Sequence, residues 1–228
     1  MQHFSWHFRS HIPDLTSHIR LEFVEVKSST IDELMKPFES IEEELRQRDP
    51  GWWDRVVEAV PELAYLAGTP QPERFHAEGD VAEHTKLAIE ACAPDCDPDL
   101  LWAALLHDVG KPLVTKDEDD TITAHGHHAV GAEIAEKILG RLQMVPERSE
   151  RIVWVIRHHT FHLSWNLTTP EQASPRHKRF VADPRFPLLL ELLRVDSVAS
   201  VDHPRGMEAY ELYSRLRQSV LASLESRV

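Results

Sequence analysis

The 228-residue sequence lacks several features that would each point to a particular class of protein. No apolar run approaches the roughly 18–20 residues that a membrane-spanning helix needs. The first residues, MQHFSWHFRSH, lack the compact apolar stretch of a signal peptide. There are only two cysteines, Cys92 and Cys96, and no second pair exists to complete a four-sulfur zinc site. We therefore expect a globular cytoplasmic protein, without a membrane partner, whose cysteines are reduced and structural.

Basic residues are also scarce relative to acidic ones. The chain has 25 Lys and Arg against 38 Asp and Glu, a formal net charge of −13. Because this balance repels polyanions at long range, we do not expect stable, nonspecific nucleic-acid binding. A small phosphate ester remains compatible, since a local cation or metal can reverse the sign of the field inside a pocket. Histidine, by contrast, is abundant, with fifteen residues and no run longer than two.

Apolar residues recur at three- and four-residue spacing along most of the chain, which predicts a helical protein with one sizeable core. Residues 1–30 are ambiguous and could form a short strand or an irregular arm. A helix is expected from about Thr30 to the residues before Pro50, and a second one from Trp52. Further helices are expected near residues 81–93, 98–108, 127–143, 147–160, 185–201 and 205–225.

The segments between these helices carry turn-forming or charged residues. Residues 68–80 are rich in proline and glycine and should form a loop, and residues 114–123 could form a small hairpin. Residues 166–179 are expected to be a second long loop. Trp52 and Trp53 could stack on nucleic-acid bases, but we expect them to pack in the core.

The segment LLHDVGKPL, residues 105–113, sets a histidine and an aspartate side by side where an apolar helix ends at glycine and proline. Neighbouring side chains on a helix point about 100° apart. His107 and Asp108 can therefore reach one metal ion only near the helix end, with other helices supplying the remaining ligands. Asp196 is a candidate because it interrupts a leucine-rich helix, where an unpaired buried carboxylate would be costly. Other candidates at inner helix positions are His84, His127, His158 and His159.

The order His84, then His107-Asp108, then Asp196 resembles that of the metal ligands in the HD superfamily of metal-dependent phosphohydrolases. Five segments, HAEGDVAEHT, LLHDVGKP, HGHHAVGAEIAEKIL, VIRHH and LLRVDSVAS, resemble the HD domain that follows the catalytic head of bacterial CCA-adding tRNA nucleotidyltransferases. The resemblance runs from about Leu63 to Ser200. The Gly-Gly-x-x-Arg-Asp segment and the Asp-x-Asp pair of that head are missing, so the tRNA-polymerising activity is not carried over. We expect an all-α HD-domain bundle around a metal centre at residues 63–228, preceded by a mostly helical extension at residues 1–62.

The resemblance also implies a ligand set. His159 could replace His158, because the sequence does not show which of two adjacent imidazoles turns inward. Nitrogen and carboxylate ligands suit manganese, iron, nickel, cobalt or zinc better than calcium. Two ions that shared the Asp108 carboxylate and a water would lower the pKa of that water and clamp an in-line displacement at phosphorus. The implied ligands are His84, His107, Asp108 and Asp196 for a first metal, with His127 and His158 for a second.

Several charged residues near these ligands have candidate roles. Lys111 could neutralise a phosphate oxygen, so Asp108 and Lys111 are the expected catalytic residues. Arg157 and Arg194, each beside a ligand, could do the same or pair with carboxylates. Asp80 could orient the His84 imidazole, but we expect it to cap its helix.

Most of the other histidines are expected to have no chemical role. His125 and His128 flank the stronger candidate at position 127 and remain weaker candidates themselves. The histidines expected to have no chemical role are His3, His7, His11, His18, His76, His162, His177 and His203.

The function expected from this pattern is metal-dependent hydrolysis of a phosphomonoester or phosphodiester. The resemblance favours a nucleotide or a 2′,3′-cyclic phosphate as the substrate. Two alternatives remain open: a di-iron HD-domain oxygenase, and a non-catalytic HD module that senses nucleotides or binds a partner. A degenerate module should have lost at least one of the six ligand positions, and all six are present.

Overall fold

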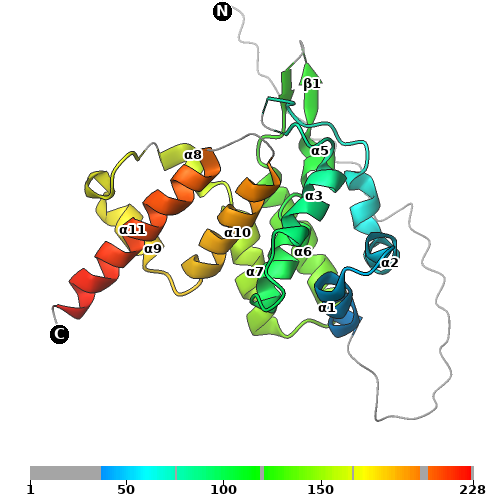
Figure 1. Ribbon diagram of the computed structural model, residues 1–228, viewed down its shortest axis with the longest axis horizontal. Coiled ribbons are helices and arrows are strands. Elements are labelled where there is room, and N and C mark those ends of the chain that lie inside the picture. The colour runs from blue at the N-terminus through cyan, green and yellow to red at the C-terminus, as the bar shows by residue number, and fades with distance from the viewer. Residues whose placement is uncertain (1–36, 75, 119–120, 166, 201–204, 227–228) are drawn as a thin grey trace, which may run out of the picture. The chain divides into compact units, whose positions relative to one another are not determined.

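The computed structural model describes residues 37–74, 76–118, 121–165, 167–200 and 205–226. All of these described residues belong to one compact unit. The ambiguous segment at residues 1–30 and the start of the first expected helix lie outside the described residues. The described part is all-α apart from one small hairpin, which confirms the expected fold class (Figure 1). Its elements are α1 (Pro37–Gln47), α2 (Trp52–Ala59), η2 (Pro61–Leu66), α3 (Val81–Glu90), α4 (Pro98–Leu106), α5 (Lys111–Val114), β1 (Lys116–Glu118), β2 (Thr121–Thr123), α6 (His127–Arg141), α7 (Pro146–His158), α8 (Phe161–Trp165), η3 (Pro170–Gln172), α9 (Pro175–Val181), α10 (Phe186–Ala199) and α11 (Arg205–Glu225).

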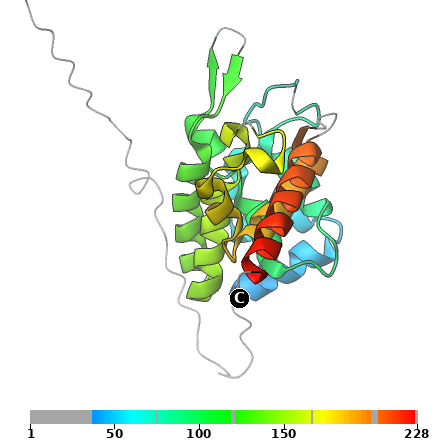
Figure 2. The same ribbon diagram turned by 90° about the vertical axis from the view of Figure 1, so that its left-hand side faces the viewer.

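Helix α4 lies at the centre of the core. It is buried along its whole length from Asp99 to Leu106, and it packs against α1, α3, α7 and α10. Helices α6 and α7 pack against each other, as do α10 and α11, and Figure 2 brings α11 to the front. Because α4 is covered on several sides, its C-terminal end delivers side chains into the interior rather than to the surface.

The first two helices share this core. Phe38 and Leu45 of α1 and Val56 of α2 are buried in the same apolar cluster as α4. Trp52 is buried and Trp53 is half-buried, with ring centroids 5.6 Å apart in an edge-to-face arrangement, so both pack as expected. The boundary between residues 62 and 63 stays a prediction.

The start of α3 lies where the capping residue in the sequence predicts it. Asp80 accepts a hydrogen bond from the backbone N–H of Glu83 and thereby caps α3. The expected hairpin is present, with Lys116 opposite Thr123 in an antiparallel pair.

Cys92 and Cys96 are free thiols, and Cys92 is buried in the core. Among the described residues, no helix has the length and apolar character needed to cross a membrane.

The expectation of one long loop at residues 166–179 was wrong. This segment contains η3 and most of α9, and a further short helix, α8, precedes it. Ser174 accepts a hydrogen bond from the N–H of His177, whose ring accepts one from the N–H of Ser174. This reciprocal cap, with Pro175 at the first helical position, starts α9 inside a stretch whose prolines had suggested a loop.

Candidate metal centre

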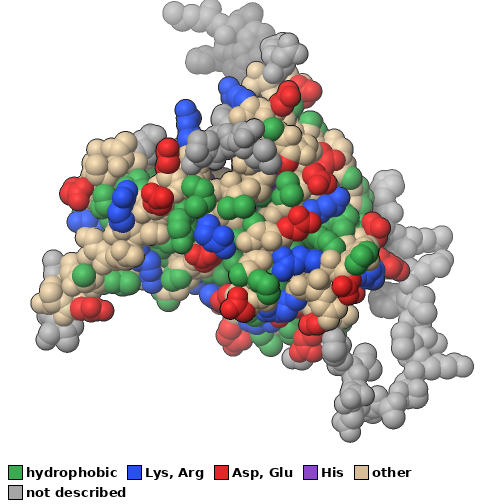
Figure 3. Space-filling model, in the orientation of Figure 1, with side chains coloured by type: hydrophobic (Ala, Val, Ile, Leu, Met, Phe, Trp, Pro, Cys, Tyr) green, Lys and Arg blue, Asp and Glu red, His purple; other side chains and the backbone are tan. Residues whose placement is uncertain are grey.

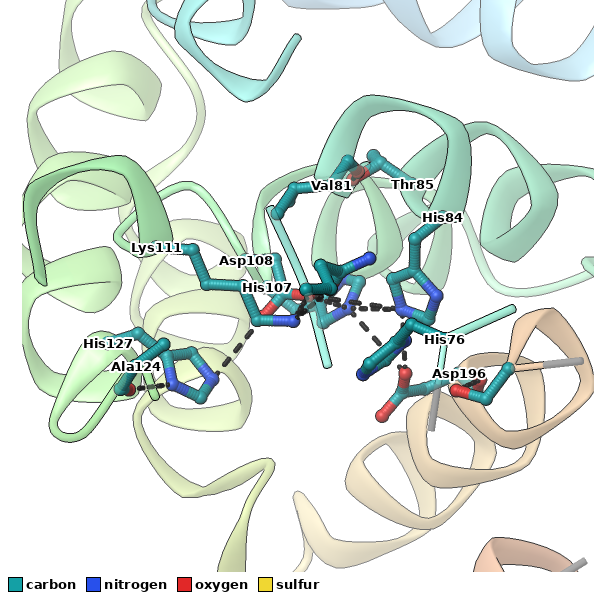
Figure 4. Close-up of polar contacts among 12 residues, drawn as sticks. His76, Val81, His84, Thr85, His107, Asp108, Lys111, Ala124, His127 and Asp196 are labelled. Carbon is teal, nitrogen blue, oxygen red and sulfur yellow. Dashed lines mark hydrogen bonds and ion pairs between the residues drawn. The ribbon is translucent and has the colours of Figure 1, made fainter. Parts of the chain in front are cut away.

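Five separate elements bring histidines and aspartates to one interior point. Figure 4 shows His84, His107, Asp108, His127 and Asp196 among them. Four of the residues lie at helix ends, where a side chain can point along the helix axis as well as away from it. His107 and Asp108 follow the last residue of α4, His127 begins α6, and His159 follows α7. His84 and Asp196 instead lie within α3 and α10.

A close backbone approach holds two of these elements together. A Cβ at Gly110 would lie 2.3 Å from the carbonyl oxygen of His127 and 2.5 Å from the backbone nitrogen of Gly131. Only glycine permits this approach, because real Cβ atoms do not come so near to backbone atoms. The turn after Asp108 can therefore lie directly against the start of α6.

The first group of candidate ligands consists of His84, His107 and Asp196. The Nε2 atom of His84 lies 2.9 Å from Asp196 Oδ1 and 3.4 Å from His107 Nε2. His107 Nε2 is 3.8 Å from the same Asp196 oxygen. The three ligand atoms all lie within 4.8 Å of one another, so one ion could contact all of them.

The second group consists of Asp108, His127 and His159. His127 Nε2 lies 3.3 Å from Asp108 Oδ1 and 3.0 Å from His159 Nε2. His159 Nε2 lies 3.8 Å from Asp108 Oδ1. This group also meets the 4.8 Å limit for a shared ion.

The Asp108 carboxylate lies between the two groups. Its Oδ1 faces the second group, whereas its Oδ2 lies 3.2 Å from His107 Nε2 and 3.9 Å from His84 Nε2. The side chain is buried. Burial alone would raise the pKa of Asp108, but the neighbouring His107 and Lys111 hold that pKa well below its ordinary value. An ionised carboxylate with one oxygen toward each group has the geometry of a bridging ligand.

The imidazoles are oriented in a way that fits metal binding. In each ring Nδ1 meets an acceptor, so Nε2 is the atom that is directed toward the other candidate ligands. A divalent cation would displace protons from this site and satisfy the Nε2 atoms and the carboxylates together. The acceptors are Glu78 Oε1 for His84 at 2.7 Å, the carbonyl of Ala104 for His107 at 2.8 Å, that of Ala124 for His127 at 2.7 Å and that of Ile156 for His159 at 2.7 Å.

Electrostatic surroundings differ between the two groups. Burial lowers the pKa of His84, but the hydrogen bonds to Asp196 and Glu78 outweigh it and raise that pKa to about 9. His84 in turn holds the pKa of Asp196 well below its ordinary value, against the effect of burial. Burial and the neighbouring His127 lower the pKa of His159 to about 3. His159 is therefore neutral, as a metal-binding imidazole must be.

Of the two adjacent histidines at the end of α7, the structure places His159, and not the expected His158, beside the other candidate ligands. His159 is buried beside Asp108 and His127, whereas His158 lies outside both groups. The His158 ring packs against Trp154, with centroids 4.5 Å apart. Successive residues on a helix point about 100° apart, and here His159 points toward the centre while His158 points toward Trp154.

Lys111 lies next to the candidate ligands, as expected. Its Nζ atom is 2.6 Å from Asp108 Oδ2 and donates to Gln71 Oε1, also at 2.6 Å. Arg194 pairs with Glu191 at 2.8 Å, and Arg157 is exposed. Of these three cations, Lys111 contacts the candidate ligands directly.

Two neighbours of the centre were not found by sequence reasoning. A single oxygen of Glu78 accepts hydrogen bonds from His84 Nδ1 at 2.7 Å and from His76 Nδ1 at 2.8 Å. The Glu78 side chain is 1% exposed, and hydrogen bonds to the two imidazoles lower its pKa to about 2 although burial opposes this. Glu78 thus has the orienting position that had been considered for Asp80. An acidic residue in a loop six residues before a ligand gives no periodic signal that could have identified it.

A cavity of about 310 Å³ opens beside the candidate ligands. Ligands from both groups line it, and the Asp196 side chain is 23% exposed toward it. This volume is at the lower end of the roughly 300–1,000 Å³ range of small-molecule sites. The lining residues near the candidate centre are His76, Asp108, Lys111, His127, His159 and Asp196.

Comparisons with known proteins show which sequences this chain is similar to. A family model described as HD domain matches residues 79–194, just over half of the chain. An A-adding tRNA nucleotidyltransferase from Deinococcus radiodurans is 33% identical over 177 residues, which cover 74% of this chain and 38% of that protein. A multifunctional CCA protein from Teredinibacter turnerae is 38% identical over 102 residues, which cover 44% of this chain and 24% of that protein. The chain thus spans between about a quarter and two fifths of the length of these curated relatives.

Proposed function

The chain belongs to the HD domain family, a superfamily of metal-dependent phosphohydrolases, and on that premise we propose that it hydrolyses a phosphomonoester or phosphodiester. The proposed substrate is a nucleotide or a 2′,3′-cyclic phosphate. The names of the matched relatives, which are tRNA nucleotidyltransferases and CCA proteins, support a nucleotide-containing substrate.

One observation carries the proposal: four imidazoles and the Asp196 carboxylate surround the Asp108 carboxylate at the wall of a cavity. Two divalent ions there would supply an activated water and neutralise charge on the phosphoryl group. The proposed first-metal ligands are His84, His107, Asp108 and Asp196, and the proposed second-metal ligands are Asp108, His127 and His159.

The chain's own residues would hold these groups in place. Asp108 would fix the spacing of the two ions, because its two oxygens face different groups. Lys111 Nζ, 2.6 Å from Asp108 and at the cavity wall, would pair with a phosphate oxygen and stabilise the negative charge that develops there. The buried Glu78 would keep the His84 ring in its binding orientation.

The test is elemental analysis of protein purified without a histidine tag, followed by a phosphoester screen with each divalent metal added back. Asp108→Ala should lose both the bound metal and the hydrolysis, whereas Asp95→Ala, at an exposed position, should retain both. Metal and turnover retained in Asp108→Ala would contradict the proposal. Oxygen consumption by an iron-loaded protein with an organic substrate would favour the oxygenase, and no metal and no turnover with any ion would favour a non-catalytic module.

A further inference from the structure

A second cavity of about 490 Å³ adjoins the cavity at the candidate metal centre. The two cavities share three lining residues, His162, Leu163 and Arg205. The second cavity, which we call the outer cavity, lies between α8 and α11 and has no candidate metal ligand in its lining. A molecule bound at the metal centre could therefore extend into the outer cavity without leaving the protein surface.

The wall between the cavities is fixed by tight helix packing. A Cβ at Gly206 would lie 2.0 Å from Ser197 Oγ, so the start of α11 lies directly on α10. Ser197 directly follows the candidate ligand Asp196, and Arg205 directly precedes Gly206. The contact between Gly206 and Ser197 therefore fixes where Arg205 lies relative to the candidate ligand Asp196. Its side chain is exposed, and no ion pair involves it in the described part of the chain.

The lining of the outer cavity combines apolar and hydrogen-bonding groups. Leu163, at the junction, is 69% exposed, and Leu167, Ala209 and Leu212 add further apolar surface. Thr168, which is exposed, adds a hydroxyl group beside them. A nucleoside has the same mixture, with an apolar base face and polar sugar hydroxyls, whereas a lipid tail would need a fully apolar wall.

The charges of the outer cavity argue against a long polyanion. Two arginines, Arg205 and Arg215, are matched by two exposed glutamates, Glu208 and Glu211. Single-stranded nucleic acids bind in grooves with an excess of positive charge along the backbone. On the face drawn in Figure 3, acidic and basic side chains are interspersed rather than gathered into a basic track. The lining can therefore accept one uncharged group more readily than a row of phosphates.

We propose that the outer cavity binds the single nucleoside of a mononucleotide substrate while its phosphate lies at the metal centre. This inference rests on the proposed function and specifies its substrate class. Leu163 and Ala209 would contact the base, and Arg205 would lie at the boundary where the nucleoside meets the phosphate.

The test compares two non-hydrolysable ligands that share one phosphonate group. Calorimetry on the manganese-loaded protein would measure the binding of a nucleoside phosphonate and of methylphosphonate. The nucleoside phosphonate should bind at least tenfold more tightly. Ala209→Trp should fill the outer cavity and remove this difference, while methylphosphonate binding stays unchanged.

Two further variants distinguish obstruction of the outer cavity from misfolding of the protein. Thr168→Trp obstructs the same cavity from an exposed position and should have the same effect. Gln218→Trp, exposed on α11 and outside the cavity lining, should keep the full difference. Equal binding of the two phosphonates by the unmodified protein, or an unchanged difference in both obstructed variants, would overturn the inference.

Two further outcomes distinguish this inference from its premise. If the unmodified protein prefers the nucleoside phosphonate but hydrolyses no phosphoester, the proposed function fails and the nucleoside site stands. If oligonucleotide affinity instead grows with chain length and falls steeply with salt, the single-nucleoside site is wrong.

Discussion

At the scale of single residues, metal binding at the candidate centre also depends on the ring nitrogens that face away from it, because their hydrogen bonds orient the imidazoles. Each imidazole has its Nδ1 hydrogen bonded, to a backbone carbonyl or, for His84, to the Glu78 carboxylate. A carboxylate is a stronger acceptor than a carbonyl and also raises the basicity of the ring it holds. Glu78 should therefore affect metal binding although it is not itself a proposed ligand.

We predict that Glu78→Gln weakens metal binding by about 10–100-fold. Glutamine keeps the size of the side chain but removes the charge that polarises His84. Calorimetric titration with manganese or zinc would measure the change. Glu83→Gln, at an exposed position on α3, should bind metal like the unmodified protein, and an unchanged affinity in Glu78→Gln would contradict the role assigned here.

The adjacent histidines of α7 provide a second residue-scale test. His159→Ala should reduce the metal content from two ions to one, because it removes a nitrogen that lies 3.0 Å from His127 Nε2. His158→Ala should leave two ions bound, since that ring packs against Trp154 outside both groups. Elemental analysis of both variants gives the answer, and the reverse pattern would restore His158 as the ligand.

At the scale of elements, the sequence identified most helices because they carry long, regular apolar stripes. Helices α3, α6, α7 and α10 begin within one residue of the expected position. Helix α9 was missed because only seven residues form it and its start depends on the local cap at Ser174. The angle at which α4 delivers His107 and Asp108 could not be predicted either, because it depends on the contact of Gly110 with α6.

Replacement of Gly110 should show how tightly this contact is constrained. Gly110→Ala should lower the free energy of unfolding by about 1–3 kcal/mol or more, because its Cβ would meet the His127 carbonyl at 2.3 Å. Gly140→Ala is the matched control, since a Cβ there in α6 meets nothing within 4 Å. It should raise stability by about 0.5–1 kcal/mol through helix propensity. Denaturant unfolding measures both, and equal effects of the two variants would contradict the close-packing argument.

At the scale of the whole molecule, the order of the motifs predicted that residues far apart in the sequence would lie close together in the fold. His84 and Asp196 are separated by 112 positions, yet their side chains lie 2.9 Å apart. Resemblance to a known ligand order made that pair predictable. Glu78, the choice of His159 and the outer cavity were not predictable, because each depends on the direction of a side chain or on the packing of α8 against α11.

The metal should also stabilise the whole fold, because its proposed ligands come from five elements that approach one another only when the chain is folded. An ion at 100 times its dissociation constant adds about 2.7 kcal/mol to the free energy of unfolding. For a chain of this size, chelation should therefore lower Tm by roughly 5–10 °C. Thermal unfolding with and without a chelator measures the shift, and Asp108→Ala should show none. A Tm that chelation leaves unchanged in metal-loaded protein would mean that the ion binds outside the interior, because only a site formed by folding couples metal affinity to stability.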